Sequence, residues 1–150
     1  MVARKRPDQQ TLAAWAAWLR AHRLITSELD RDLRDKTGVT LDDYDVLVQL
    51  AMADGSRLMM SQLADALLLA RSSCTRIVAR LVVNGWVERV ADDADGRVVW
   101  AVLTASGRRV QRRAAVVHLD GIQQEFGRHL RGRDAAVLQA VAERISAGGD

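Results

Sequence analysis

The sequence has one cysteine, no long apolar run and no apolar segment in its first ten residues. Cys74 stands alone among 150 residues, which excludes an internal disulfide framework and a Cys-x-x-Cys metal site. The most hydrophobic segments are interrupted by Arg, Asp or Gln within a few residues, so none reaches membrane-spanning length. The opening stretch MVARKRPDQQ lacks the apolar core of a signal peptide. We expect a cytoplasmic protein without a membrane partner.

Side chains that would support catalysis or hold a metal ion are not grouped along the chain. The sequence shows no Ser-His-Asp, paired-carboxylate or phosphate-loop pattern. His22, His118 and His129 lack the paired spacing of metal ligands. We therefore expect that the protein is not an enzyme and uses no cofactor and no metal ion.

The composition is that of one folded domain with a weakly basic balance. Hydrophobic residues make up 49% of the chain, enough to bury a core. Lys plus Arg number 22 against 19 Asp plus Glu, for a net charge of +3. Such a balance mildly favours a polyanionic partner, but only the distribution of charge over the protein can decide whether it binds one.

Helix signals dominate the first half of the chain. Asp8 can cap a helix over residues 8–36 that Gly38 ends, and Thr40 with Asp43 forms a capping box for a helix over 41–53. After a turn at 54–55, residues 57–59 can pair as a short strand. The next predictions are a helix over 62–69 capped by Ser61, and a helix that Ser72 or Ser73 opens and Asn84-Gly85 closes.

The periodicity changes from 3.6 to 2 after that fourth helix. Residues 86–91 and 97–103 are rich in Val and Trp, and the acidic stretch DDADG between them predicts a hairpin with Gly96 at its tight position. Thr104 then caps a long helix over 105–126, and a last helix covers 135–145. The predicted fold is mainly α with a small β-hairpin wing, an α+β class.

The two terminal helices are long for so small a body. A helix of roughly 28 residues spans about 40 Å, whereas a compact chain of this size has a radius of gyration near 15 Å, by a rough scaling law. Their apolar stripes would be uncovered in one copy. We therefore expect a two-fold homodimer in which the terminal helices of two copies intertwine.

The stretch SSCTRIVARLVVNGWVE, residues 72–88, has two unlike helical faces. Cys74, Ile77, Val78, Leu81 and Val82 form an apolar arc, and hydroxyls and guanidiniums lie outside it. A short helix followed by such a helix is typical of a helix-turn-helix, whose second helix enters the major groove. There Arg pairs with guanine and Ser or Thr contacts bases or phosphates. The hairpin is placed like a wing, with Arg97 near its tip suited to the minor groove.

At this point the sequence resembles the MarR family of winged helix-turn-helix regulators. The likeness covers residues 38–107 and includes S-x-x-T-R, the following R-L, N-G-W-V-E-R, the D-x-R wing tip and L-T-x-x-G. It implies a dimer that binds a pseudo-palindromic double-stranded operator, usually as a repressor, and that in many members is released by a small aromatic or phenolic ligand. The implied lobe spans about 38–104, with dimerisation helices over about 8–36 and 105–147.

The resemblance also implies roles for single residues. Asp95 corresponds to the wing aspartate that steadies the tip arginine. Many members have D-R-R where this chain has Asp95-Gly96-Arg97, so one tip arginine is missing. The implied DNA contacts are Ser72, Ser73, Thr75, Arg76 and Arg80 in the major groove and Arg97 in the minor groove.

Each assignment competes with a plainer one. Arg76 and Arg80 could lie on a solvated helix face, and the acidic wing tip would also suit a dimeric module that binds a protein partner instead of DNA. Trp15, Trp18 and His22 could pack in the core or dimer, or line an aromatic effector pocket. Further cations could contact phosphates or only solubilise the protein; these are Arg4, Lys5, Arg6, Arg108, Arg109, Arg112 and Arg113. Cys74 is expected to be buried and inert.

Overall fold

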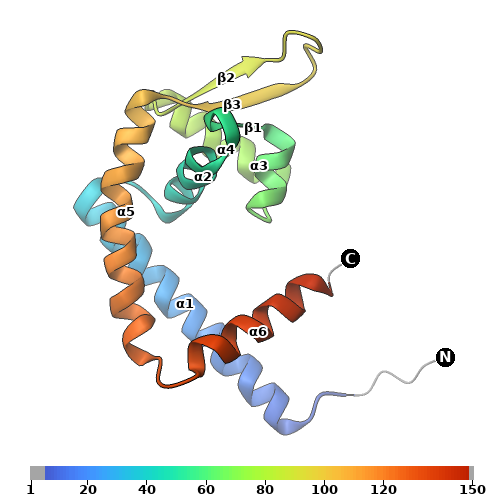
Figure 1. Cartoon of the computed structure of the whole chain (residues 1–150), viewed down its shortest axis with the longest axis vertical. Helices are drawn as coiled ribbons and strands as arrows, with labels where there is room; N and C mark the ends of the chain where they lie inside the picture. Colours follow the sequence, from blue (N-terminus) through green and yellow to red (C-terminus); the bar gives the residue numbers. More distant parts are fainter. Residues whose placement is uncertain (1–5, 149–150) are drawn as a thin grey trace, which may run out of the picture.

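The chain folds into a winged helical lobe with long helices extending from it. The computed structural model describes residues 6–148. In Figure 1 the lobe lies at the top, α1 runs up to it from below, and α5 runs back down to α6. The elements in order are α1 Gln9–Thr37, α2 Leu41–Met52, the 3-10 turn η1 Asp54–Ser56, β1 Arg57–Met59, α3 Met60–Ala66, α4 Arg71–Val83, β2 Val87–Ala91, β3 Val99–Leu103, α5 Ala105–Glu125, η2 Gly127–His129 and α6 Asp134–Ala147.

The predicted caps of the long helices are confirmed. The Asp8 carboxylate accepts a hydrogen bond from the backbone N–H of Thr11 at the start of α1, and Gly38 ends that helix with φ 74°. Thr40 and Asp43 form the predicted capping box at α2. The Thr104 hydroxyl accepts from the N–H of Gly107 at the start of α5. These helices begin and end where local chemistry satisfies their free backbone groups.

The two helices of the helix-turn-helix begin differently from the prediction. The Ser61 cap is wrong, because α3 begins at Met60 and ends at Ala66, well short of 69. The Ser72 or Ser73 cap is wrong too, because Ala70 precedes α4 and both serines lie within its first turn. Met59 and Ala70, the residues before these helices, carry no hydroxyl; at α3 the side chain of Gln62 accepts instead from the N–H of Met59 at 3.0 Å.

The predicted short strand joins the hairpin in one antiparallel sheet. The strand order is β1-β3-β2, with Leu58 opposite Ala101 and Arg89 opposite the same residue on the other side. Gly96, predicted at the tight position of the hairpin, lies in a turn that the N–H of Val98 closes on the carbonyl oxygen of Asp95 at 2.8 Å, and its φ is not positive. Side-chain hydrogen bonds to backbone N–H groups also hold the tip.

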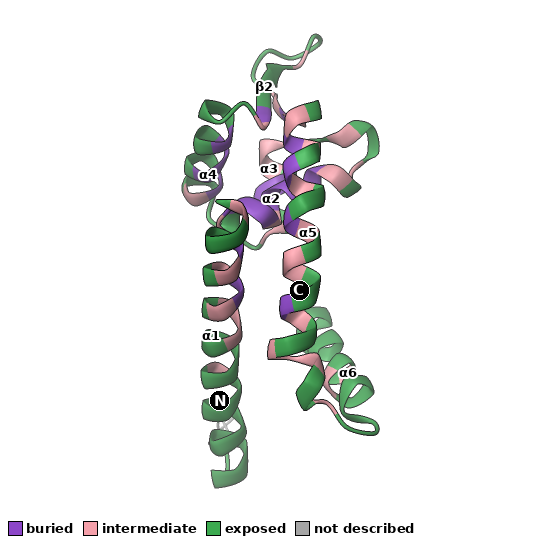
Figure 2. Ribbon diagram, turned by 90° about the vertical axis from the view of Figure 1, so that its left-hand side faces the viewer, coloured by how far each residue is buried: buried purple, intermediate pink, exposed green. Residues whose placement is uncertain are grey.

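Burial is concentrated in the lobe, as Figure 2 shows. The core joins α2, α3, α4, the sheet and the adjoining ends of α1 and α5; its fully buried side chains include Leu33, Leu47, Leu50, Leu63, Val78 and Leu81. Outside the lobe, α1 and α5 approach closely at Gly121, where an added Cβ would lie 2.6 Å from a methyl carbon of Leu29. None of the helices in residues 6–148 is both long and apolar enough to cross a membrane.

Candidate nucleic-acid interface

One face of α4 is buried and the other is open and free of acids. Cys74, Ile77, Val78 and Leu81 pack into the core as predicted, whereas Val82, expected with them, is 37% exposed. Ser72, Thr75 and Arg76 are exposed and Ser73 is half-buried. Because α4 contains neither Asp nor Glu, its outer face offers hydroxyl and guanidinium groups to a partner and no carboxylate.

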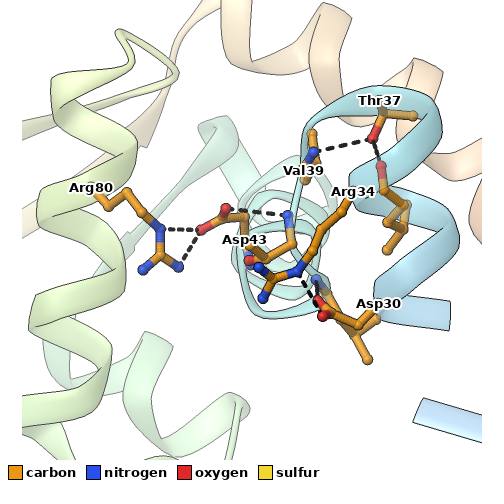
Figure 3. Close-up of polar contacts among 9 residues, drawn as sticks. Asp30, Arg34, Thr37, Val39, Asp43 and Arg80 are labelled. Atoms are coloured by element: carbon orange, nitrogen blue, oxygen red, sulfur yellow. Dashed lines mark hydrogen bonds and ion pairs between the residues drawn. The ribbon is translucent and has the colours of Figure 1, made fainter. Parts of the chain in front are cut away.

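The two arginines on that face differ in their surroundings. Among residues 6–148, Arg76 makes no side-chain hydrogen bond or ion pair with another residue. The guanidinium of Arg80 donates through Nε and Nη2 to Oδ1 of Asp43, at 3.0 and 2.6 Å (Figure 3). Arg76 is therefore available to an external acceptor, and Arg80 has only part of its donor set left.

Asp43 connects α4 to the start of α2. Its side chain is almost completely buried; Oδ2 accepts from the N–H of Thr40 at 3.3 Å, while Oδ1 accepts from Arg80. Asp30 of α1 accepts from the N–H of Leu41 at 2.8 Å, so the start of α2 is held from both sides (Figure 3). A buried carboxylate with these partners fixes how α4 sits on α2 and α1, because losing one partner would leave polar groups unpaired.

The acidic wing tip is built by its own carboxylates. Asp92 accepts from the N–H groups of Ala94 and Asp95 and from the indole N–H of Trp100 at 2.9 Å. The Trp100 bond, followed by the backbone bonds, lowers the pKa of Asp92. Arg57 stacks over the Trp100 ring, 4.5 Å from its centroid. The negative charge that argued against DNA therefore has a structural use in shaping the turn.

The side chain of Asp95 contacts the backbone of Arg97, not its guanidinium. Oδ1 of Asp95 accepts from the backbone N–H of Arg97 at 3.0 Å, and no ion pair between their side chains occurs within the part of the chain that the structure describes. The exposed Arg97 guanidinium remains at the tip. Asp95 thus orients the main chain at Arg97 and leaves the side chain able to reach outward.

A hollow of about 310 Å³ lies between α4 and the wing. Three arginines, Arg71, Arg89 and Arg97, line it together with Thr75 and Ser61, and no acid does. Clustered guanidiniums without a counter-charge favour a phosphate. Arg71 and Arg89 were not among the residues predicted to lie at the interface. Arg71 lies four residues before Thr75 on the same helical face and could have been included, but Arg89 required the strand register.

The three residues considered for an effector lie away from the core. Trp15 and Trp18 are 59% and 49% exposed, and His22 is exposed. Packing in the core of a single chain is thereby excluded for the two indoles. Packing in a dimer and a ligand pocket both stay as predictions.

A second aromatic pair, which the sequence analysis missed, lies between α2 and α5. The rings of Tyr44 and His118 are 4.5 Å apart, and Nδ1 of His118 is buried without a hydrogen-bond partner in the described chain. Burial lowers the pKa of His118, and burial and then the charge of Asp45 raise the pKa of Tyr44. The imidazole is held neutral where the lobe meets the long helices.

The expectation of a buried thiol at Cys74 is confirmed. Cys74 is fully buried, and burial raises the pKa of its thiol, so it stays protonated. A Cβ at Gly107 would lie 2.0 Å from the carbonyl oxygen of Trp86, so the close approach at the hinge requires glycine. No group of three or more potential metal ligands occurs within residues 6–148. Arg4 and Lys5 of the expected basic arm lie outside the described residues.

Comparisons with known proteins agree with this geometry. The model of the MarR family matches residues 37–98. The chain is similar to Sco3205, a MarR family transcriptional regulator from Streptomyces coelicolor solved in complex with DNA, with 30% identity, TM-score 0.92 and coverage of 99% of this chain and 92% of that one. AbsC, a MarR family transcriptional regulator from the same organism, has 29% identity, TM-score 0.88 and coverage of 95% and 96%.

A more distant structure shares the fold. Bordetella bronchiseptica BpsR, whose DNA binding is regulated by 6-hydroxynicotinic acid, has 19% identity, TM-score 0.78 and coverage of 89% of this chain and 98% of that one. A comparison with curated protein sequences finds no match.

Proposed function

Because this chain belongs to the MarR family of winged helix-turn-helix transcriptional regulators and is a DNA-binding regulator of that type, we propose that it is a sequence-specific repressor. It would bind a pseudo-palindromic operator as a homodimer, one α4 helix in each of two successive major grooves. The observation that carries the proposal is the acid-free outer face of α4 beside a hollow lined by three arginines.

Base reading in this proposal rests on α4. Arg76 is exposed and has no partner in the described chain, so its guanidinium can pair with guanine O6 and N7. The exposed hydroxyl of Ser72 can bind bases or phosphates. Thr75 already donates its hydroxyl hydrogen to the carbonyl oxygen of Arg71 at 2.9 Å. Toward DNA it would therefore accept a hydrogen bond or contribute its methyl group. Ser73 completes the set from its half-buried position.

Phosphate and minor-groove contacts would come from the flanking cations. Arg97 at the wing tip would lie in or along the minor groove, where a narrow groove concentrates negative potential. Arg80 would combine its ion pair to Asp43 with a phosphate contact through its remaining N–H groups. Asp95 would support the wing by holding the backbone at Arg97.

The homodimer accounts for the apolar surface outside the lobe. Exposed large apolar side chains cluster on the terminal helices, among them Leu12, Leu24, Val116, Leu119, Val137 and Ile145. Patches of this kind on a folded chain mark interaction sites, and a second copy offers the same helices in self-complementary form. The two α4 helices must then lie about 34 Å apart to reach successive grooves.

Release by a small aromatic or phenolic ligand completes the proposal. BpsR, which shares the fold, is regulated by such a compound. Trp15, Trp18 and His22 would supply two ring faces and a hydrogen-bonding group to it if they line a site between two copies. The ligand would act by binding more tightly to a dimer whose α4 helices are wrongly spaced.

The test is fluorescence anisotropy of the full chain against DNA from upstream of its own gene, with scrambled DNA as competitor, over a range of salt. We expect tight binding that resists the competitor and weakens steeply with salt, because bound arginines release counterions. Weak, equal binding to both duplexes, followed by failure to select any specific fragment from genomic DNA, would contradict the proposal and favour a protein partner for the winged lobe.

A further inference from the structure

The turn between α3 and α4 places a leucine in a backbone conformation that normally requires glycine. The N–H of Leu69 donates to the carbonyl oxygen of Ala64 at 2.9 Å, and the N–H of Leu68 donates to that of Asp65 at 3.1 Å. This pair of bonds closes a helix in the Schellman motif. Leu68 occupies the left-handed position of the motif, with φ 53°, where a side chain with a Cβ is sterically strained.

Within residues 6–148, no packing of the Leu68 side chain compensates for this strain. The neighbours Leu67 and Leu69 pack against the core. Leu68 is 93% exposed, the largest exposure of any large apolar side chain within residues 6–148. A glycine would satisfy the same hydrogen bonds without strain and without an apolar group in water. Strain of this kind is retained where it serves a function.

The position of the turn indicates what the side chain contacts. Leu68 lies three residues before Arg71, the first residue of α4 and part of the arginine-lined hollow. In a helix-turn-helix the beginning of the second helix is the part that reaches base edges. The apolar group that the major groove presents is the C5 methyl of thymine.

We propose that Leu68 is a specificity-determining residue that packs against the C5 methyl of one thymine in each operator half-site. The inference rests on the proposed function, since it assumes an operator in the groove of α4. It adds a hydrophobic contact to an interface otherwise made of hydroxyls and guanidiniums.

The experiment uses the full chain and a duplex that the wild type selects from a random DNA pool. Single thymines are replaced by deoxyuridine, which removes only the methyl group, and affinity is measured for the wild type, Leu68→Gly and Leu68→Asn. The matched control is Val83→Ala, since Val83 is 87% exposed at the other end of α4. Melting temperature is recorded for every variant.

We expect deoxyuridine at one position per half-site to weaken the wild type by about fourfold, the effect of one buried methyl group. Leu68→Gly and Leu68→Asn should bind the thymine duplex more weakly and be indifferent to that replacement. Their melting temperatures should rise by about 2 to 4 °C through relief of strain, so lost folding cannot explain the weaker binding. Val83→Ala should behave as the wild type.

The inference would be overturned if the Leu68 variants bound the thymine duplex as tightly as the wild type, or if deoxyuridine weakened their binding as much as it weakens that of the wild type. Either result would leave the proposed function standing. A lower melting temperature in both variants would overturn it as well, since the leucine would then be stabilising. If the wild type selects no duplex from the pool, the proposed function itself fails.

Discussion

The lobe, residues 38–104, and the arms, helices α1, α5 and α6, bury their apolar residues in opposite ways. In the lobe, side chains such as Leu47, Leu63 and Val78 are completely buried. In the arms, α6 contains no buried residue at all, and Trp15 of α1 is more than half exposed. Figure 2 shows the change from one region to the other along α1 and α5.

From this difference we infer that the two regions have different partners. The lobe holds the core, to which α1 and α5 contribute only at their adjoining ends. The outer face of α4 and the hollow beside it expose hydroxyls and arginines without an acid, which suits a polyanion. The arms have apolar stripes that a single chain leaves in water, which costs about 25 cal/mol for each Å² kept exposed. We infer that the lobe recognises DNA and that the arms set the distance between two lobes.

The largest expected effect comes from a charge placed on an arm. Val137 of α6 is 56% exposed in one chain, and Val137→Asp would bury an unpaired carboxylate in the proposed homodimer. A cost of about 3 kcal/mol or more should raise the dimer dissociation constant at least about 100-fold, measured by sedimentation equilibrium. The matched control is Met52→Asp, on an 81% exposed residue of the lobe; a dimer equally weakened by it would remove the distinction between the regions.

Loss of the free arginine on α4 should come next. Arg76→Ala should lower operator affinity by about 1 to 3 kcal/mol and relax the base preference at one position, measured by anisotropy against single-base operator variants. Arg131→Ala, in the turn between α5 and α6, serves as the control and should leave both quantities unchanged. Unaltered base preference in Arg76→Ala would refute its assignment as a base reader.

Two acids of the wing should respond in opposite directions, because only one of them holds the turn. Asp92→Ala removes the acceptor of two backbone N–H groups and the Trp100 indole, and we expect operator affinity to fall by about fivefold as the tip loosens. Asp93→Asn removes the same charge from an exposed residue and should raise affinity slightly by reducing repulsion of phosphates. Equal changes in both variants would mean that charge alone matters.

The smallest effect is a pH dependence at the junction of the regions. Burial lowers the pKa of His118 in the folded chain, so the unfolded chain binds the proton more readily. The contribution of neutral His118 to the free energy of unfolding is complete above the pKa of the unfolded chain, about 6.5, and is lost as the pH falls toward the pKa in the folded chain. Between pH 7 and 5.5, the free energy of unfolding measured by chemical denaturation should decrease less for His118→Phe than for the wild type. The control His129→Phe should decrease by as much as the wild type.

Sequence reasoning succeeded where the determinants are local. The caps at Asp8, Thr40 and Thr104 depend on residues three positions apart, and the alternation of the hairpin depends on neighbours in the chain. It failed at the starts of α3 and α4, because these helices begin after Met59 and Ala70, residues that have no capping hydroxyl. The ion pair of Arg80 with Asp43, 37 residues apart, leaves no pattern along the chain.

The candidate site divides in the same way. The exposed face of α4 follows from helical spacing, so Ser72, Thr75 and Arg76 could be placed from the sequence. The hollow with Arg89 arises only when the sheet brings β2 beside α4. The strain at Leu68 has no sequence signal except a leucine where the turn favours glycine.

The most direct test of the central claim is the stoichiometry and affinity of binding to a full operator and to a half-site, measured by analytical ultracentrifugation with a labelled duplex. Two lobes spaced by the arms predict two chains on each full operator, bound together, and at least about 100-fold weaker binding to a half-site, since the second lobe no longer contributes. One chain on each duplex, with equal affinity for the full operator and the half-site, would contradict the account.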